Sequence, residues 1–151
     1  MTVNYIPDGY HSITPYLILS NAAQGLEYYK QAFGAVELLR LSDPAGKVMH
    51  AEIRIGNSVI MLADEFPEID AHSPTTLKGT PVSLMIYVED VDSQFDRAIK
   101  SGATIRRPVT DQFYGDRNGI LVDPFGHVWT ISTHKEDLTP EEIQERTRAT
   151  N

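Results

Sequence analysis

His50 and Glu52 are the two side chains of this sequence best placed to do chemistry. They stand two positions apart in residues 48–55, where apolar and polar residues alternate as in a β-strand, so both point to one face. The positions between and beyond them are apolar and predict a face packed against a helix: Ala51, Ile53 and Ile55. An imidazole and a carboxylate on one cavity wall could form a general acid–base pair or bind a polar group of a ligand. The alternative is an exposed strand on which both pair with Arg54 or with solvent.

The elements that must position this pair follow from hydrophobic periodicity and turn residues. The first half predicts a strand, a helix ended by Gly34 and three more strands, at residues 13–19, 22–33, 35–41, 48–55 and 58–63. The second half predicts a strand, a helix closed by Gly102 and three more strands, at residues 82–88, 92–100, 104–109, 118–123 and 127–133. An element order that occurs twice predicts an α+β fold of two βαβββ modules in one domain spanning residues 1–151.

The module boundaries are set by a connecting segment and a tail. Module 1 is predicted at about residues 13–64 and module 2 at about 82–134, with a connecting loop at 65–81 that is rich in Pro and Gly. Thr139-Pro-Glu-Glu142 is a capping box, which predicts a short C-terminal helix over about residues 139–148. Its charged face indicates a solvated surface, with a lid or a dimer contact as alternatives.

Composition excludes several classes of protein. The 151 residues carry 13 Lys and Arg against 21 Asp and Glu, a net charge of −8 that disfavours binding to nucleic acid. The absence of Cys excludes disulfides, thiolate–metal sites and a Cys nucleophile. No apolar run approaches the roughly 18 residues of a membrane helix, and the N-terminus does not resemble a signal peptide. A cytoplasmic protein without membrane or nucleic-acid partners is expected.

Three stretches resemble a known family: Ile13-Thr-Pro-Tyr-Leu-Ile-Leu19, Met49-His-Ala-Glu-Ile-Arg-Ile-Gly56 and Phe113-Tyr-Gly-Asp-Arg-Asn-Gly-Ile-Leu-Val-Asp-Pro-Phe-Gly-His-Val-Trp129. They are similar to the PhnB-like branch of the glyoxalase/bleomycin-resistance/dioxygenase superfamily, the vicinal oxygen chelate (VOC) proteins. The resemblance implies two modules whose cupped mixed sheets form a barrel-like wall around a cavity, with helices outside. It also implies a homodimer, and a divalent metal held by His, Glu or Gln at four strand positions.

The residues at those four positions do not suit a metal. In this sequence they are Thr14 or Pro15, Met61, Ser83 and Thr130, none of which carries an imidazole or a carboxylate. A catalytic divalent ion needs about three such ligands. We therefore predict no metal and no other cofactor, and a metal built on His50 and Glu52 alone would have too few ligands.

The remaining candidates predict a lining for a small, flat molecule. Strand alternation places Tyr16 and Tyr87 on the faces of Thr14 and Ser83, which the resemblance turns toward the cavity. Together with the acid–base pair, the predicted ligand-binding residues are Tyr16, His50, Glu52, Met61, Ser83, Met85, Tyr87, Phe113, Tyr114, Arg117 and Thr130. For the aromatic residues the alternative is an ordinary core, and for Arg117 it is an ion pair with Asp116 or Asp123. His11, His72 and His134 fall in predicted loops and form no constellation.

Two functions remain open at this point. The first is a metal-free homodimer that binds a small, partly aromatic molecule, with His50 and Glu52 holding its polar edge. The second is an enzyme, such as a lyase, isomerase or dioxygenase, that uses His50 and Glu52 for acid–base chemistry or holds a divalent metal at a displaced site. An inert cavity with a structural role is a third possibility.

Overall fold

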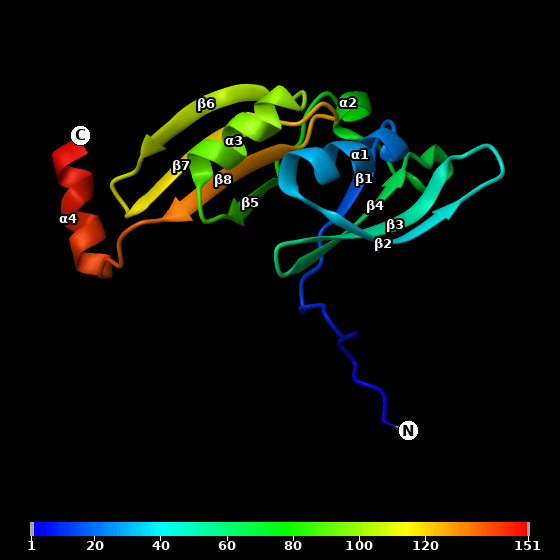
Figure 1. Cartoon of the computed structure of the whole chain (residues 1–151), viewed down its shortest axis with the longest axis horizontal. Coiled ribbons are helices and arrows are strands. Elements are labelled where there is room, and N and C mark those ends of the chain that lie inside the picture. The colour runs from blue at the N-terminus through cyan, green and yellow to red at the C-terminus, as the bar shows by residue number, and fades with distance from the viewer. Residues whose placement is uncertain (1, 151) are drawn as a thin grey trace. The chain divides into compact units, whose positions relative to one another are not determined.

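The structure, a computed structural model, describes residues 2–150 and has two compact units that meet in sequence at Thr80 and Pro81 (Figure 1). Each unit contains one four-stranded mixed sheet and one long helix in the order βαβββ. The predicted α+β fold of two such modules is confirmed. The cup-like cavity that the resemblance implied stays a prediction.

Unit 1 contains the first sheet. Its elements are β1 (Tyr16–Leu19), α1 (Ala22–Phe33), β2 (Val36–Ser42), β3 (Val48–Ile55) and β4 (Ser58–Asp64). The strand order is β1-β4-β3-β2, with β1 parallel to β4 and the other neighbours antiparallel. β1 begins later than predicted, because residues 13–15 precede the paired part of the strand.

Unit 2 repeats this order. Its elements are β5 (Ser83–Tyr87), α3 (Val91–Lys100), β6 (Thr104–Asp111), β7 (Asp116–Val122), β8 (Val128–His134) and the C-terminal α4 (Pro140–Thr150). The strand order is β5-β8-β7-β6, with β5 parallel to β8. The C-terminal helix starts as predicted, because the Glu142 amide donates to Thr139 Oγ1 at 3.1 Å and Glu142 Oε1 accepts from the Thr139 amide at 3.3 Å.

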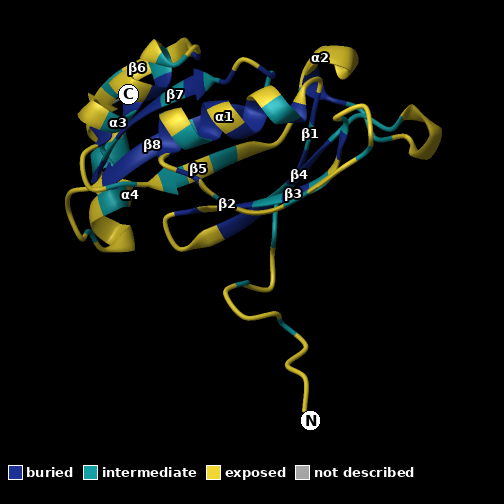
Figure 2. Ribbon diagram, turned by 45° about the vertical axis from the view of Figure 1, so that its right-hand side comes forward, coloured by how far each residue is buried: buried dark blue, intermediate teal, exposed yellow. Residues whose placement is uncertain are grey.

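Each long helix covers one face of its own sheet. In α1 the buried side chains recur at helical spacing, at Leu26, Tyr29 and Phe33, and Figure 2 shows this buried stripe beside an exposed one. Gly34 ends the helix with φ of 66°, a conformation that favours glycine. In β3, Ala51 and Ile53 are fully buried, while the alternate side chains lie on the opposite face. We call that opposite face the helix-free face of the unit.

A polar residue at or next to the end of β4 and of β8 bonds to the start of the helix in each unit. Asp64 accepts hydrogen bonds from the amides of Ala22 and Val48, both at 2.7 Å, so it joins the first turn of α1 to β3. In unit 2, Thr133 Oγ1 accepts from the Val91 amide at the start of α3 at 3.0 Å. One free amide at the N-terminus of each long helix is thus satisfied by a central strand of its own sheet.

The predicted connecting loop at 65–81 is more ordered than expected. It holds a 3-10 turn (Pro67–Ile69) and a short helix, α2 (Pro74–Leu77), and most of it belongs to unit 1. Glu65 fixes this turn, because Oε1 accepts from the Ser73 amide at 2.7 Å and from the Thr76 hydroxyl at 2.5 Å. Among residues 2–150, no helix is both long and apolar enough to cross a membrane.

Candidate functional site

A chain of hydrogen bonds on the helix-free face of unit 1 brings Tyr16, His50 and Glu52 together. The Tyr16 hydroxyl lies 2.8 Å from His50 Nδ1, and His50 Nε2 lies 2.8 Å from Glu52 Oε2. The three residues come from β1 and β3, and β4 lies between these strands. Strand alternation correctly placed His50 and Glu52 on one face, and the structure adds Tyr16 as their third member.

The protonation pattern of this chain follows from its partners. Partial burial raises the pKa of the Tyr16 phenol above its ordinary value, so the hydroxyl keeps its proton at neutral pH. A phenol that donates to Nδ1 leaves Nε2–H to donate to the Glu52 carboxylate, and a neutral imidazole satisfies both bonds. Tyr16 is the most exposed member at 47%, so its oxygen lone pairs are the part of the chain that solvent or a ligand reaches.

Met61 gives this polar chain an apolar neighbour. In the sheet register Met61 lies directly between Tyr16 of β1 and Glu52 of β3. Its amide also donates to Pro15 O at 3.0 Å, which places Pro15 beside Met61 at the edge of the sheet. A flexible thioether beside a phenol and an imidazole–carboxylate pair is suited to a ligand that is flat and apolar with a polar edge.

The residues of this face do not fit a divalent metal. Pro15 and Met61 offer no charged ligand, and both ring nitrogens of His50 already face hydrogen-bond partners. In the part of the chain that the structure describes, no three His, Asp or Glu side chains gather in a way that could hold a metal ion.

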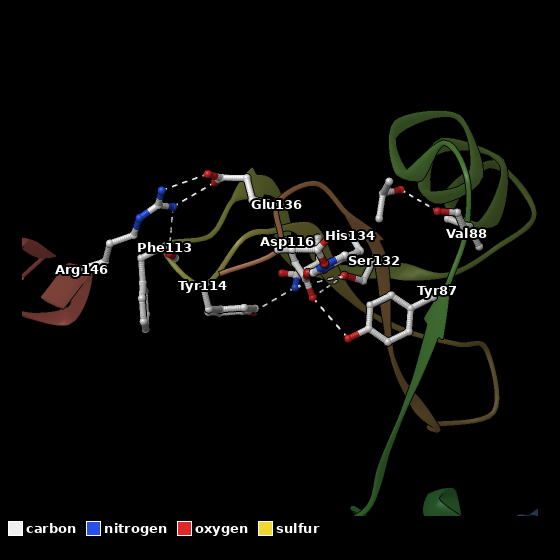
Figure 3. A network of polar contacts seen from close by, with 12 residues as sticks. Tyr87, Val88, Phe113, Tyr114, Asp116, Ser132, His134, Glu136 and Arg146 are labelled. Carbon is white, nitrogen blue, oxygen red and sulfur yellow. Dashed lines mark hydrogen bonds and ion pairs between the residues drawn. The ribbon is translucent and has the colours of Figure 1, made fainter. Parts of the chain in front are cut away.

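The helix-free face of unit 2 carries a different polar network, centred on Asp116. This carboxylate is only 6% exposed and accepts from the hydroxyls of Tyr87 and Ser132, both at 3.3 Å, and from His134 Nδ1 at 2.7 Å (Figure 3). His134 Nε2 lies 2.8 Å from Asp137 Oδ1. Of these residues only Tyr87 was predicted as a site residue, and the prediction that His134 joins no constellation is wrong.

Asn118 extends this network toward the loop that carries Tyr114. Its fully buried side chain donates to the Tyr114 hydroxyl at 2.9 Å and accepts from the Arg107 guanidinium at 2.5 Å. The alternation of Asp116 and Asn118 in β7 is a signal that could have revealed the network.

The other predicted site residues fall into two groups. Ser83, Met85, Tyr87 and Thr130 follow the expected alternation, and Met85 lies beside Thr130 in the register of β5 and β8. Arg117 instead lies on the helix side of the sheet, where its guanidinium makes two hydrogen bonds to Asp92 of α3, at 2.8 and 2.9 Å, and one to Asp111. The structural alternative for Arg117 is therefore the one that the structure supports, although with different partners. Phe113 packs edge-on against Tyr114, with ring centroids 5.2 Å apart.

Comparisons with known proteins assign this chain of two βαβββ units to a family. Residues 10–131 match the family model described as the Glyoxalase/Bleomycin resistance protein/Dioxygenase superfamily, and the chain belongs to this superfamily. An uncharacterized protein of Mycobacterium bovis is 40% identical over 147 residues, covering 95% of this chain and 94% of the relative.

Solved structures show the same fold at low sequence identity. TioX from Micromonospora sp. ML1 is 24% identical with a TM-score of 0.63, covering 85% of this chain and 100% of that one. A PhnB protein from Bacillus cereus is 18% identical with a TM-score of 0.63, covering 82% of this chain and 99% of that one. Because the PhnB protein is one such neighbour among others, the superfamily is established and the PhnB-like branch is not specifically supported.

Proposed function

We propose that this protein binds a small, flat molecule on the helix-free face of unit 1, through Tyr16, His50 and Glu52. The observation that carries the proposal is the unbroken chain of two 2.8 Å hydrogen bonds joining these side chains beside Met61. Within residues 2–150 the second carboxylate oxygen of Glu52 has no hydrogen-bond partner, so the face offers two acceptors: this oxygen and the Tyr16 oxygen. A ligand edge with N–H or O–H donors suits them, and its apolar plane suits Met61 and the Tyr16 ring.

A thermal-shift screen of aromatic compounds that carry such donors tests the proposal. A ligand that binds the folded chain raises its melting temperature in a concentration-dependent way. Tyr16→Phe removes one hydrogen bond and should weaken binding roughly 2- to 10-fold, the usual contribution of such a bond. Tyr5→Phe and His11→Gln are matched controls on exposed residues before β1 and should leave affinity unchanged. Equal affinities for Tyr16→Phe and Tyr5→Phe would contradict the proposal.

Acid–base catalysis is the second candidate, and the same geometry favours it. A carboxylate, an imidazole and an exposed phenol in series could pass a proton to or from a bound substrate at the Tyr16 oxygen. His50→Gln separates the two functions, because a binding protein should keep most of its affinity while an enzyme should lose turnover roughly 10²–10⁴-fold. Mass spectrometry of a bound compound after incubation shows whether it is returned unchanged.

We also propose that the chain forms a homodimer, and the support comes from exposed apolar side chains on the edge strand β2. Four apolar side chains of β2 are at least 40% exposed: Val36, Leu38, Leu39 and Leu41. An edge strand with exposed apolar side chains favours association. Light scattering should then give about 34 kDa, twice the chain mass of 16.9 kDa. Membership of the PhnB-like branch and a cytoplasmic location remain predictions.

A further inference from the structure

The C-terminal segment is tied to the loop that carries Phe113 and Tyr114. Arg146 of α4 makes two hydrogen bonds to the Glu136 carboxylate, both at 2.9 Å, and a third to the Phe113 carbonyl oxygen at 3.2 Å (Figure 3). A guanidinium is suited to such a role, because its planar fork holds a carboxylate with two donors and leaves others free. The Arg146 side chain thus connects α4 both to the segment that precedes it, at Glu136, and to the loop, at Phe113.

The backbone contact beside Arg146 is close. The amides of Lys135 and Glu136 both donate to the Gly115 carbonyl oxygen, at 2.8 and 3.0 Å. Gly115 has φ of 99°, and a Cβ at this position would lie 2.6 Å from Glu136 O. A glycine is therefore required where the C-terminal segment crosses the loop.

His134 provides a second tie, between Asp116 of β7 and Asp137 before α4. Its two ring nitrogens lie 2.7 and 2.8 Å from carboxylate oxygens, which only accept hydrogen bonds. A neutral imidazole has a single N–H, so both bonds are made only by the protonated ring. The other charged or titratable groups around it are Tyr87 of β5, which donates to Asp116, the chain neighbours Lys135 and Glu136, and Arg146, which neutralises Glu136.

We propose that residues 134–146 form a strap that positions the loop of residues 112–115, with Arg146 and His134 as positioning residues, and that the His134 tie opens when the ring loses its proton. The inference goes beyond ligand binding and does not depend on it.

The direction of the pH effect follows from the two carboxylates. Their hydrogen bonds raise the pKa of His134 above its ordinary value of about 6.5. The tie is therefore complete below that value and is lost as the pH rises through the higher pKa of the folded chain. The strap should be tighter in weakly acidic than in alkaline solution.

Hydrogen exchange of the Lys135 and Glu136 amides in the full-length protein tests the strap. After correction for the pH dependence of exchange in unstructured peptides, protection at these amides should fall as the pH rises past neutrality. Arg146→Gln should speed their exchange roughly 2- to 5-fold, the effect expected for an exposed ion pair. His134→Gln should remove the pH step, because glutamine does not titrate.

Two matched controls make the test specific. Arg148→Gln removes an arginine of the same helix that pairs with Glu145 and makes no described contact with the loop, so exchange should not change. His11→Gln should keep the pH step. Amides in the middle of the β7–β8 ladder, away from the end formed by Asp116 and His134, report on global unfolding and should stay protected in every variant. Unchanged exchange in Arg146→Gln, or a pH step that persists in His134→Gln, would overturn the inference.

Discussion

His50 and His134 lie on the helix-free faces of the two units, and their partners differ in one respect. His50 lies between a phenol and a carboxylate, so a neutral ring satisfies both hydrogen bonds. His134 lies between two carboxylates, so its ring must be protonated to satisfy both. The phenol–imidazole–carboxylate chain of unit 1 is available for binding or proton transfer, whereas His134 of unit 2 joins two segments of its own unit.

The positions of these groups within the sheets differ too. In unit 1 the register places Tyr16, Met61 and Glu52 side by side across three strands. The matching row in unit 2 is Met85, Thr130 and Ile120, which contains no titratable group. Duplication of the fold therefore did not duplicate the chemistry, because the polar network of unit 2 lies toward the strand ends, at Asp116 and His134.

The largest predicted effect is a difference in the free energy of unfolding between substitutions on the two faces of the unit 2 sheet, the helix side and the helix-free face. Trp129 is 1% exposed, and its ring nitrogen donates to Asp123 Oδ2 at 2.8 Å. Trp129→Ala should lower the free energy of unfolding by about 3–5 kcal/mol, as expected for a buried aromatic. Met85→Ala on the exposed face should cost no more than about 0.5 kcal/mol.

Urea unfolding of both variants gives these free energies. Trp129→Phe serves as an intermediate control, since it keeps a six-membered aromatic ring but loses the five-membered ring of the indole together with the N–H that donates to Asp123. Similar losses of unfolding free energy for Trp129→Ala and Met85→Ala would contradict the difference in burial between these two side chains.

A second prediction compares the two carboxylates. Asp116→Asn should reduce the free energy of unfolding by about 1–3 kcal/mol, because a buried carboxylate with three donors is replaced by an amide that accepts fewer of them. Glu52→Gln should change it by at most about 0.5 kcal/mol, since Glu52 has one partner and a free oxygen. Thermal unfolding measures both losses. A larger loss of stability for Glu52→Gln than for Asp116→Asn would mean that Glu52, and not Asp116, is the structural carboxylate.

Much of this arrangement was predictable from local patterns. The alternation in residues 48–55 placed His50 and Glu52 correctly, and Gly34 and the capping box at Thr139 marked helix ends because their causes are local. The hydrogen bond from Tyr16 to His50 depends on strand order, which joins residues 34 positions apart. Periodicity contains no such information, so this third member could be placed on a face but not in contact.

The misassigned residues have a similar explanation. Arg117 follows the alternation of β7 to the helix side, where Asp92 of α3 lies, and this partner comes from another element. His134 was assigned to a loop because β8 extends one residue further than predicted and ends on it. For Arg117 the deciding partner comes from a distant segment, whereas for His134 the deciding fact is where the strand ends.

A third prediction compares the two tyrosines in ligand binding. Tyr16→Phe should weaken binding more than Tyr87→Phe, because the ligand is proposed to lie on unit 1 beside Tyr16, whereas Tyr87 belongs to unit 2 and its hydroxyl donates to Asp116. We expect a loss of roughly 2- to 10-fold for Tyr16→Phe and less than about 2-fold for Tyr87→Phe, by isothermal titration calorimetry with a compound from the screen. A larger loss of affinity for Tyr87→Phe than for Tyr16→Phe would indicate that the ligand binds to unit 2.

The smallest predicted effect is the pH response of two contacts, the Glu65 turn of unit 1 in acid and the His134 strap of unit 2 in alkali. Hydrogen bonds from Ser73 and Thr76 lower the pKa of Glu65 to about 2, so its contribution to the turn is present above its ordinary value of about 4.5 and is lost as the pH falls toward 2. The amide resonances of Ser73 and Thr76 should shift in that range and not in Glu65→Gln. The strap of unit 2 should respond only at higher pH, through His134.

The most direct test of the account is an NMR titration of the full-length protein with a compound from the screen, mapping the shifted resonances onto the chain. The account predicts saturable shifts at Tyr16, His50, Glu52 and the Met61 methyl group, with the buried helix-side residues Ala51 and Ile53 affected less. Saturable shifts that leave Tyr16, His50 and Glu52 unchanged would contradict the claim that the helix-free face of unit 1 is the binding site.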